Sequence, residues 1–178
     1  MGCDIHSLAV VRNEETNEVT PVVCNVVIGN NSTRLDPCNT FRNYFVFGLL
    51  TGGKVRDIGI KSMNLPFKGK YPFKVNMSGD KSTDTFLQNY FDNGDCGYHS
   101  HTYVSLHDLR WLQDVIYQER IKYRMPKNEY ELEYISMLEN ALSLIGEITN
   151  FLTSVSYNLW LNDNENKCEV ELLLMFDS

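Results

Sequence analysis

Apolar, β-branched segments stand at both ends of the chain and predict strands there. Residues 5–12 are rich in isoleucine and valine, and a polar turn over 13–18 separates them from a second valine-rich segment over 19–28. We expect these two segments to pair as a hairpin, with Pro21 placing the second strand near an edge because proline cannot donate to a sheet ladder. A further apolar segment over 168–176 predicts a terminal strand.

Two short helices and a long loop are predicted in the first half of the chain. Apolar residues recur at spacing three over 41–50, where Thr40 could cap a helix, and a second short helix is expected near 84–91. Residues 54–81 hold seven basic and two acidic side chains, a balance of +5, and glycine and proline interrupt their periodicity. This basic segment is predicted to be a loop, and loops longer than about 15 residues are usually functional or mobile.

Helical spacing is clearest in the second half of the chain. Ser105 and Asp108 form a variant capping box before an apolar stripe that Pro126 ends. Asn128 is then expected to cap a second helix, which gives an αα-hairpin. Strands at both ends with helices between them predict one α+β domain over residues 1–178, whose small antiparallel sheet includes both terminal strands and packs against the αα-hairpin and the shorter helices.

Composition limits the classes of protein that this chain can belong to. Hydrophobic residues make up 43% and charged residues 22% of its 178 residues, as in an ordinary soluble globular protein. A net charge of −7 argues against general DNA binding. No apolar run approaches the roughly 20 residues that span a bilayer, so no membrane association is expected. The five cysteines are an odd number without a Cys-x-x-Cys pair, which indicates a reduced, cytoplasmic protein rather than a disulfide framework.

Two short histidine motifs are the strongest candidates for chemistry. Asp4 and His6 stand two residues apart, as do His99 and His101, and residues at i and i+2 of an extended chain point to the same side. Three imidazoles and a carboxylate are a reasonable ligand set for one divalent metal ion, Zn or Mn. The same histidines are candidate catalytic groups. The alternative is that His99 and His101 hydrogen-bond to the backbone of a polar turn.

Cys3, beside the first motif, is a further catalytic candidate. Its thiolate could act as a nucleophile with His6 or His99 as the base. The alternative is that it is a small buried apolar side chain, as most unpaired cysteines are.

The basic loop interleaves cations with aromatic rings. That combination suits a nucleotide, because phosphate takes the charge and the base stacks on a ring. The alternative is a solvated loop that packs its aromatic residues inward. Arginines elsewhere could add bidentate phosphate contacts. The candidate ligand-binding residues are therefore Arg42, Arg56, Lys68, Lys70, Lys74 and Tyr71.

Four further segments of the chain are distinctive, namely Met1-Gly2-Cys3-Asp4-Ile5-His6, Phe41-Arg42-Asn43-Tyr44, His99-Ser100-His101-Thr102 and Met175-Phe176-Asp177-Ser178. With them the chain resembles a family of small proteins found mainly in bacteriophages and prophages, which begin with the same six residues. The most specific of these motifs are the two that contain histidine. This chain departs from the family at Val10, where such proteins commonly carry glutamate, and at residues 63–66, where they often carry a Pro-Arg-Gly-Leu-Pro loop.

The resemblance implies a phage-encoded protein that acts in the cytoplasm of the infected bacterial host, and small phage proteins of this kind often counter host defence. We expect it to bind a nucleotide-like anionic ligand or a host protein, without turnover, in a cleft lined by the histidine motifs and the basic loop. The alternative is a metal-dependent phosphoester hydrolase that uses the same residues. Asp-x-His and His-Ser-His-Thr are similar to short fragments of metal-dependent phosphoesterases of the polymerase-and-histidinol-phosphatase type. The sequence leaves the oligomeric state open.

Overall fold

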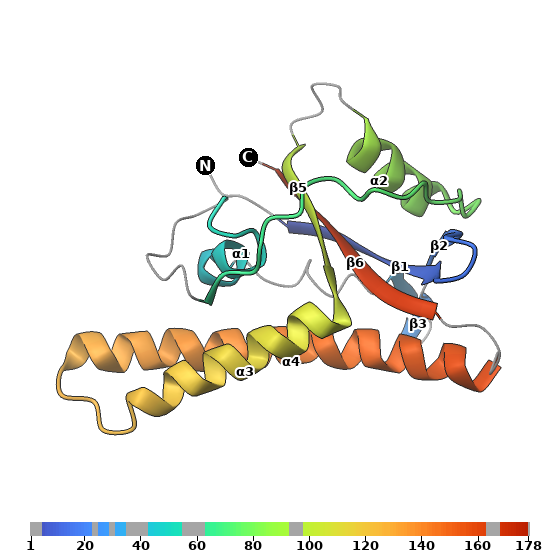
Figure 1. Cartoon of the computed structure of the whole chain (residues 1–178). Coiled ribbons are helices and arrows are strands. Elements are labelled where there is room, and N and C mark those ends of the chain that lie inside the picture. Colours follow the sequence, from blue (N-terminus) through green and yellow to red (C-terminus); the bar gives the residue numbers. More distant parts are fainter. Residues whose placement is uncertain are drawn as a thin grey trace.

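A computed structural model describes residues 5–22, 25–28, 31–34, 43–54, 63–92, 98–162 and 168–177 of the chain. Helices and strands make up most of this part, and Figure 1 shows their arrangement. In chain order they are β1 (Ile5–Asn13), β2 (Val19–Pro21), β3 (Asn25–Ile28), β4 (Asn31–Arg34), α1 (Tyr44–Leu50), α2 (Lys81–Phe91), β5 (Tyr98–Ser105), α3 (Leu106–Lys122), α4 (Glu129–Asn162) and β6 (Cys168–Asp177).

The main sheet has four antiparallel strands in the order β2-β1-β6-β5. β1 and β6 pair over their length, from Ile5 opposite Phe176 to Asn13 opposite Cys168. The α+β class and the pairing of both terminal strands are therefore as the sequence predicts. Pro21 lies in the edge strand β2, where a missing backbone donor disturbs no ladder.

Two local predictions need correction. The valine-rich segment predicted as one strand over 19–28 is divided between β2 and β3, and β3 pairs with β4 in a separate two-stranded sheet. The first helix begins at Tyr44, and its N-cap is Asn43 rather than Thr40. Asn43 Oδ1 accepts hydrogen bonds of 3.1 Å from two backbone N–H groups of the first turn, and asparagine is among the strongest N-cap residues. Thr40 itself lies outside the described residues.

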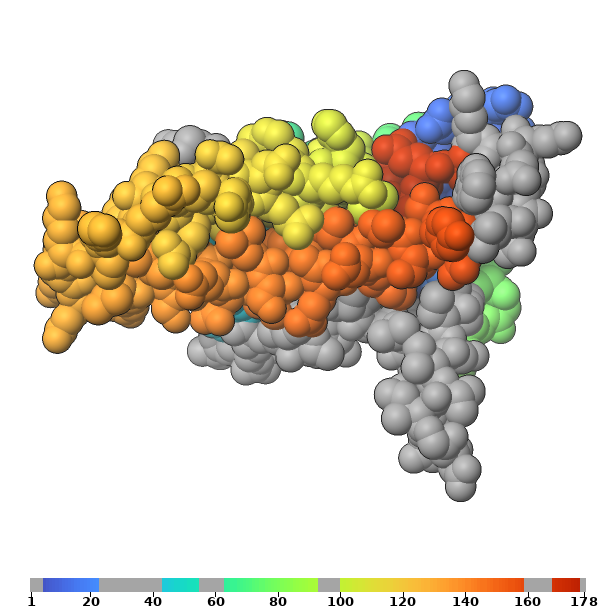
Figure 2. All heavy atoms as spheres, turned by 90° about the horizontal axis from the view of Figure 1, so that it is seen from below, coloured from blue at the N-terminus to red at the C-terminus, as the bar shows by residue number. Residues whose placement is uncertain are grey.

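α3 and α4 form the predicted antiparallel hairpin beneath the sheet, and they run side by side along that face (Figure 2). The capping box of Ser105 and Asp108 is present at the start of α3. α3 ends at Lys122, before Pro126, and Asn128 Oδ1 accepts from the backbone N–H of Glu131 as a cap of α4 should. α4 continues for 34 residues, so it extends past the sheet at one end.

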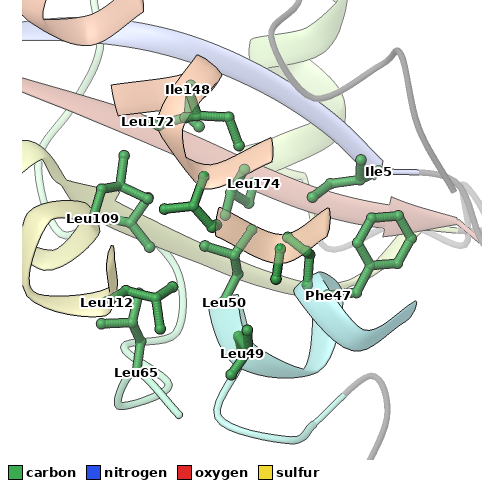
Figure 3. Packing of buried hydrophobic residues seen from close by; sticks show 14 of the residues in the cluster. Ile5, Phe47, Leu49, Leu50, Leu65, Leu109, Leu112, Ile148, Leu172 and Leu174 are labelled. Atoms are coloured by element: carbon green, nitrogen blue, oxygen red, sulfur yellow. The ribbon is translucent and has the colours of Figure 1, made fainter. Parts of the chain in front are cut away.

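A hydrophobic core lies on each face of the sheet. Alternate residues of β6 enter the two cores, because successive side chains of a strand point to opposite faces. Leu172 and Leu174 face α1, α3 and α4 in the larger core (Figure 3), whereas Leu173 and Met175 face α2 and residues 71–75. We call residues 63–80 the strap: they begin in the larger core at Met63 and Leu65 and then cross the second face toward α2. Side chains of the larger core include Ile5, Phe47, Leu49, Leu50, Leu65, Leu109, Leu112 and Ile148.

Candidate functional site

The strap is the described part of the predicted basic loop, and it has no helix or strand longer than one residue. A single parallel bridge joins Val75 to Val19, next to which Asn76 donates its backbone N–H to Val19 O at 2.9 Å. At the other end, Leu65 donates its backbone N–H to Leu49 O at 2.9 Å. The strap is thus irregular, as the sequence predicts, but attached to the body at both ends.

Two of the predicted ligand-binding lysines attach the strap to the helices. Lys68 Nζ donates to Asp108 Oδ2 at 2.5 Å and lies 4.9 Å from the centroid of the Tyr103 ring. Lys70 Nζ donates to the backbone oxygens of Phe91 and Asp92, at 3.2 and 2.9 Å, where α2 ends. A cation at a helix C-terminus also interacts favourably with the helix dipole. The charges of these lysines therefore have internal partners, and we do not retain them as ligand groups.

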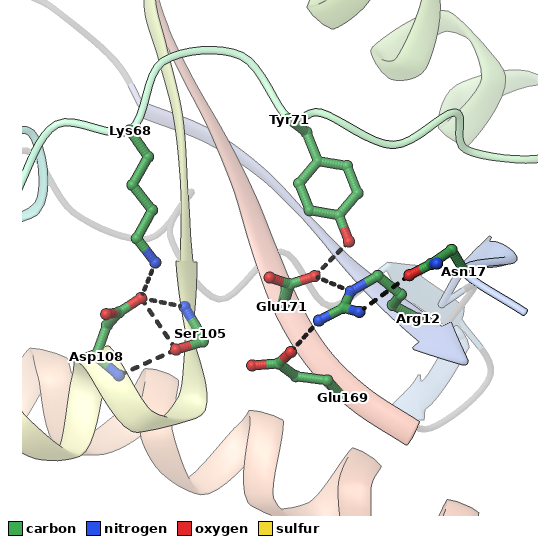
Figure 4. A network of polar contacts seen from close by, with 8 residues as sticks. All are labelled: Arg12, Asn17, Lys68, Tyr71, Ser105, Asp108, Glu169 and Glu171. Atoms are coloured by element: carbon green, nitrogen blue, oxygen red, sulfur yellow. Dashed lines mark hydrogen bonds and ion pairs between the residues drawn. The ribbon is translucent and has the colours of Figure 1, made fainter. Parts of the chain in front are cut away.

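A polar network lies under the strap on the second face of the sheet (Figure 4). The Tyr71 hydroxyl donates to Glu171 Oε2, and Arg12 Nε lies 3.5 Å from the same oxygen. Arg12 also donates to Glu169 and to Asn17 Oδ1. Only 4% of Tyr71 is exposed. Its ring is therefore almost fully packed against protein, and its contribution to ligand binding stays a prediction.

Burial dominates the protonation of this network. It raises the pKa of Glu171, although the Tyr71 hydrogen bond and the Arg12 charge favour the ionised carboxylate. It also raises the pKa of Tyr71, and the hydrogen bond to Glu171 raises it further, which keeps the hydroxyl protonated as a donor. Asp108 behaves in the opposite way. Burial alone would raise its pKa, but the hydrogen bonds from Lys68 and Ser105 outweigh burial and lower it.

A pocket with a volume of about 430 Å³ lies between the strap and α2. Ligand pockets in proteins typically have volumes of about 300–1,000 Å³ and mainly apolar walls. Lys74 is exposed at this pocket, and it forms no ion pair with any residue in the described part of the chain. The lining residues are Tyr71, Pro72, Phe73, Lys74, Val75, Met77, Leu87, Gln88 and Phe91.

The sheet brings the two histidine motifs to the same end of β6. His6 of β1 stands opposite Met175, and His99 of β5 stands opposite the next residue, Phe176. The register shifts between His99 and Thr102, and the positive φ of 52° at Ser100 marks the irregularity. β1 and β5 flank β6, so they lie roughly 10 Å apart, twice the usual strand spacing.

The described residues do not form the single cleft that the sequence predicts. The His101 ring lies edge-on to Tyr90, with centroids 5.3 Å apart, and Tyr90 in turn contacts Phe91 of the pocket wall. Neither His6 nor His101 lines the pocket. Among the described side chains, no group of three or more His, Cys, Asp or Glu could hold a metal ion. Several predicted site groups lie outside them, namely Cys3, Asp4, Arg42, Arg56 and the His99 side chain.

The three charged residues of this network were not among the predicted site residues. Glu169 and Glu171 stand two residues apart in an apolar strand, so they share a face, and Arg12 lies opposite Glu169 in the register. A charged residue within an apolar strand is a signal that a partner of opposite charge lies nearby. Gln88 and Phe91 of α2 were also missed, and only the fold brings them to the strap.

Comparison with protein-family models, with curated protein sequences and with solved structures finds no match to this chain. Over the described residues, no helix combines the length and the apolar character needed to cross a membrane.

Proposed function

We propose that this protein binds a small anionic ligand with an aromatic part, such as a nucleotide, in the pocket between the strap and α2, without turnover. The observation that supports this most is the position of Lys74. An exposed cation that forms no ion pair within the described part of the chain stands at the edge of a mainly apolar pocket. A ligand can therefore place its ring among apolar side chains and its anionic group on the ammonium.

The chemistry of the wall agrees with such a ligand. Phe73 and Phe91 give ring surfaces, and Gln88 adds an amide that can donate to and accept from the edge of a base. The net charge of −7 repels anions at long range. At physiological salt the Debye length is only about 8 Å, so the local charge of Lys74 dominates once the ligand is close.

The resemblance to phage proteins suggests where such a ligand would be met. Under this proposal the protein acts in the cytoplasm of an infected bacterium and sequesters a nucleotide signal of host defence. Binding without turnover is sufficient for that role, because removal of a signal requires only affinity and abundance.

Calorimetric titration with mono-, di- and cyclic nucleotides tests the proposal. Lys74→Gln should weaken binding by about tenfold or more, because one charge-assisted hydrogen bond contributes about 1.5–3 kcal/mol. Lys81→Gln is the matched control, since Lys81 is an exposed lysine nearby that does not line the pocket. Gln88→Trp should fill the pocket and abolish binding, whereas Thr85→Trp on the same helix should not.

Equal affinities of wild type and the Lys74 variant, or no binding by wild type, would remove the pocket from the mechanism. A host protein would then be the better candidate partner. Complex formation between this protein and proteins of the bacterial host would be measured to test it.

A metal-dependent phosphoester hydrolase is the second candidate function. One observation favours it: His6, which stands opposite Met175, and His101, which packs edge-on against Tyr90, lie on the same face of the sheet although they are distant in sequence. If imidazoles hold an ion there, metal occupancy should fall as pH drops below about 6, when free histidines take up protons. Metal occupancy is measured by elemental analysis of protein prepared without chelator, at neutral and mildly acidic pH and with added Zn or Mn. Absence of stoichiometric metal at neutral pH would contradict this candidate.

A further inference from the structure

A buried carboxylate stands behind the wall of the pocket. Glu171 lies on β6, between β1 and β5 in the sheet, and is only 5% exposed. Burying an ionised carboxylate is energetically unfavourable unless partners offset the loss of hydration. Glu171 does not line the pocket, so the proposed binding of a ligand assigns it no part.

The partners of Glu171 connect it to two rings of the pocket wall. Tyr71 donates its hydroxyl to the carboxylate, and Arg12, 3.5 Å from the same carboxylate, lies 4.9 Å from the centroid of the Phe73 ring. The rings of Tyr71 and Phe73 meet edge to face at 5.5 Å, and both line the pocket. One carboxylate therefore holds the two groups that position this part of the wall (Figure 4).

We propose that Glu171 is a positioning residue that couples the conformation of the pocket wall, and thereby ligand affinity, to pH. The effect on affinity rests on the proposed function, whereas the effect on the wall rests on geometry alone. Ionised Glu171 holds the Tyr71 hydroxyl and the Arg12 guanidinium together. Protonated Glu171 has no charge to hold Arg12, which then pairs with Glu169 alone, and the support beneath Phe73 is weakened.

The surroundings of Glu171 favour its protonated form. Burial raises its pKa, and the negative charge of Glu169 acts in the same direction. As pH falls, the wall is therefore expected to loosen at a pH above about 4.3, the ordinary pKa of a glutamate. The ionisable groups that face Glu171 are Arg12 on β1, Glu169 on β6, Tyr71 on the strap and Tyr90 on α2. On β5 the residue in register with Glu171 is the neutral Ser105, and the Lys68–Asp108 ion pair lies beside Ser105.

Methyl NMR of the full chain tests the coupling without a ligand. Met77 lines the pocket, and in protein labelled with methyl-¹³C methionine its resonance is identified by Met77→Leu. This resonance should titrate in wild type with a midpoint above pH 4.3, the ordinary value for glutamate. Glu171→Gln keeps an acceptor for Tyr71 but cannot ionise, so its Met77 resonance should resemble that of acidic wild type at every pH.

Two further variants separate Glu171 from other ionisable groups of the protein. Glu169→Gln removes a neighbouring negative charge and should move the midpoint to lower pH. Tyr71→Phe removes a hydrogen bond that favours ionised Glu171 and should move the midpoint to higher pH. These opposite shifts keep the test decisive even if Glu171→Gln does not fold. A midpoint unchanged in both variants would overturn the proposal.

Affinity for AMP, measured by calorimetry on both sides of the Met77 transition, tests the link to binding. Wild type should bind roughly three- to tenfold more weakly on the acidic side, and Glu171→Gln should lose most of this difference, apart from the part due to titration of the AMP phosphate itself. A Met77 transition without AMP binding at any pH would overturn the proposed ligand and leave the coupling standing. AMP binding with identical pH profiles in wild type and Glu171→Gln would overturn the coupling and leave the proposed function standing.

Discussion

At the scale of single residues, Arg12 determines whether Glu171 can be ionised at low cost. Its guanidinium contacts both Glu169 and Glu171, and its side chain is only 17% exposed. Removing one member of a buried ion pair is strongly destabilising because it leaves an uncompensated buried charge. An isolated surface pair behaves differently, since solvent screens both charges.

Arg12→Met should therefore lower the free energy of unfolding by about 2–4 kcal/mol at neutral pH. The loss should shrink as pH falls. Glu171 has a raised pKa in the folded state, so it contributes stability that is present at low pH and is lost as pH rises through that pKa. Removing Arg12 raises this pKa further, which makes the variant still more sensitive to rising pH. Urea denaturation at pH 7 and pH 5 measures both effects.

Arg120→Met is the control for this prediction. Arg120 pairs with Glu139 on the exposed faces of α3 and α4, with the Glu139 side chain 55% exposed. Its removal should cost less than about 1 kcal/mol, with little change between the two pH values. Equal losses for the two arginine variants would contradict a special role of Arg12.

At the scale of elements, the strap is held by contacts between residues far apart in sequence. Gly52 illustrates how closely it approaches the turn after α1. Its φ is +65°, and a Cβ at this position would lie 2.9 Å from the backbone oxygen of Leu65. That distance leaves no room for a side chain, and the conformation itself favours glycine.

Gly52→Ala should thus be more destabilising than Gly79→Ala. Gly79 has a φ of +80°, but a Cβ added there would meet no atom of the described residues within 4 Å, so only conformational strain of about 1–2 kcal/mol applies. At Gly52 the steric clash adds to that strain. Thermal denaturation of the two variants gives the comparison, and a smaller loss at Gly52 would show that the strap does not approach α1 as described.

The start of α3 provides a second prediction at this scale. Asp108 accepts hydrogen bonds from Lys68 and from Ser105, which joins helix, sheet and strap. Asp108→Asn should cost about 1–2 kcal/mol at pH 7. The pKa of Asp108 is lowered in the folded state. Its contribution to the free energy of unfolding is therefore present at pH values above its unfolded-state pKa, and it is lost as pH falls through its folded-state pKa. Asp114→Asn, at an exposed position of α3, should be nearly neutral in urea denaturation.

These elements also show which features a sequence can reveal. The terminal strands and the capping box of Ser105 depend on neighbouring residues, and both were predicted correctly. The attachments of the strap join residues 40 and 100 positions apart in the chain, Lys68 with Asp108 and Tyr71 with Glu171. No local pattern specifies such pairs, which is why the basic loop was interpreted as a ligand clamp through lysines that the fold uses internally.

At the scale of the whole molecule, the two faces of the sheet have different roles. One face packs α1, α3 and α4 in the larger core, and the other carries the strap, α2, the polar network and the pocket. His6 and His101 stand at one end of the same sheet, and neither lines the pocket. This separation means that binding at the pocket and chemistry at the histidines can be tested independently.

Chemical-shift mapping with AMP on isotope-labelled protein tests the central claim most directly. We predict saturable shifts confined to the amide and methyl groups of residues 71–77 and 87–91, with the largest change at Met77, and their loss in Lys74→Gln. Shifts centred on His6 and His101 with none at the strap or α2, or no saturable shift with any nucleotide, would contradict the claim that the pocket between the strap and α2 is the ligand site.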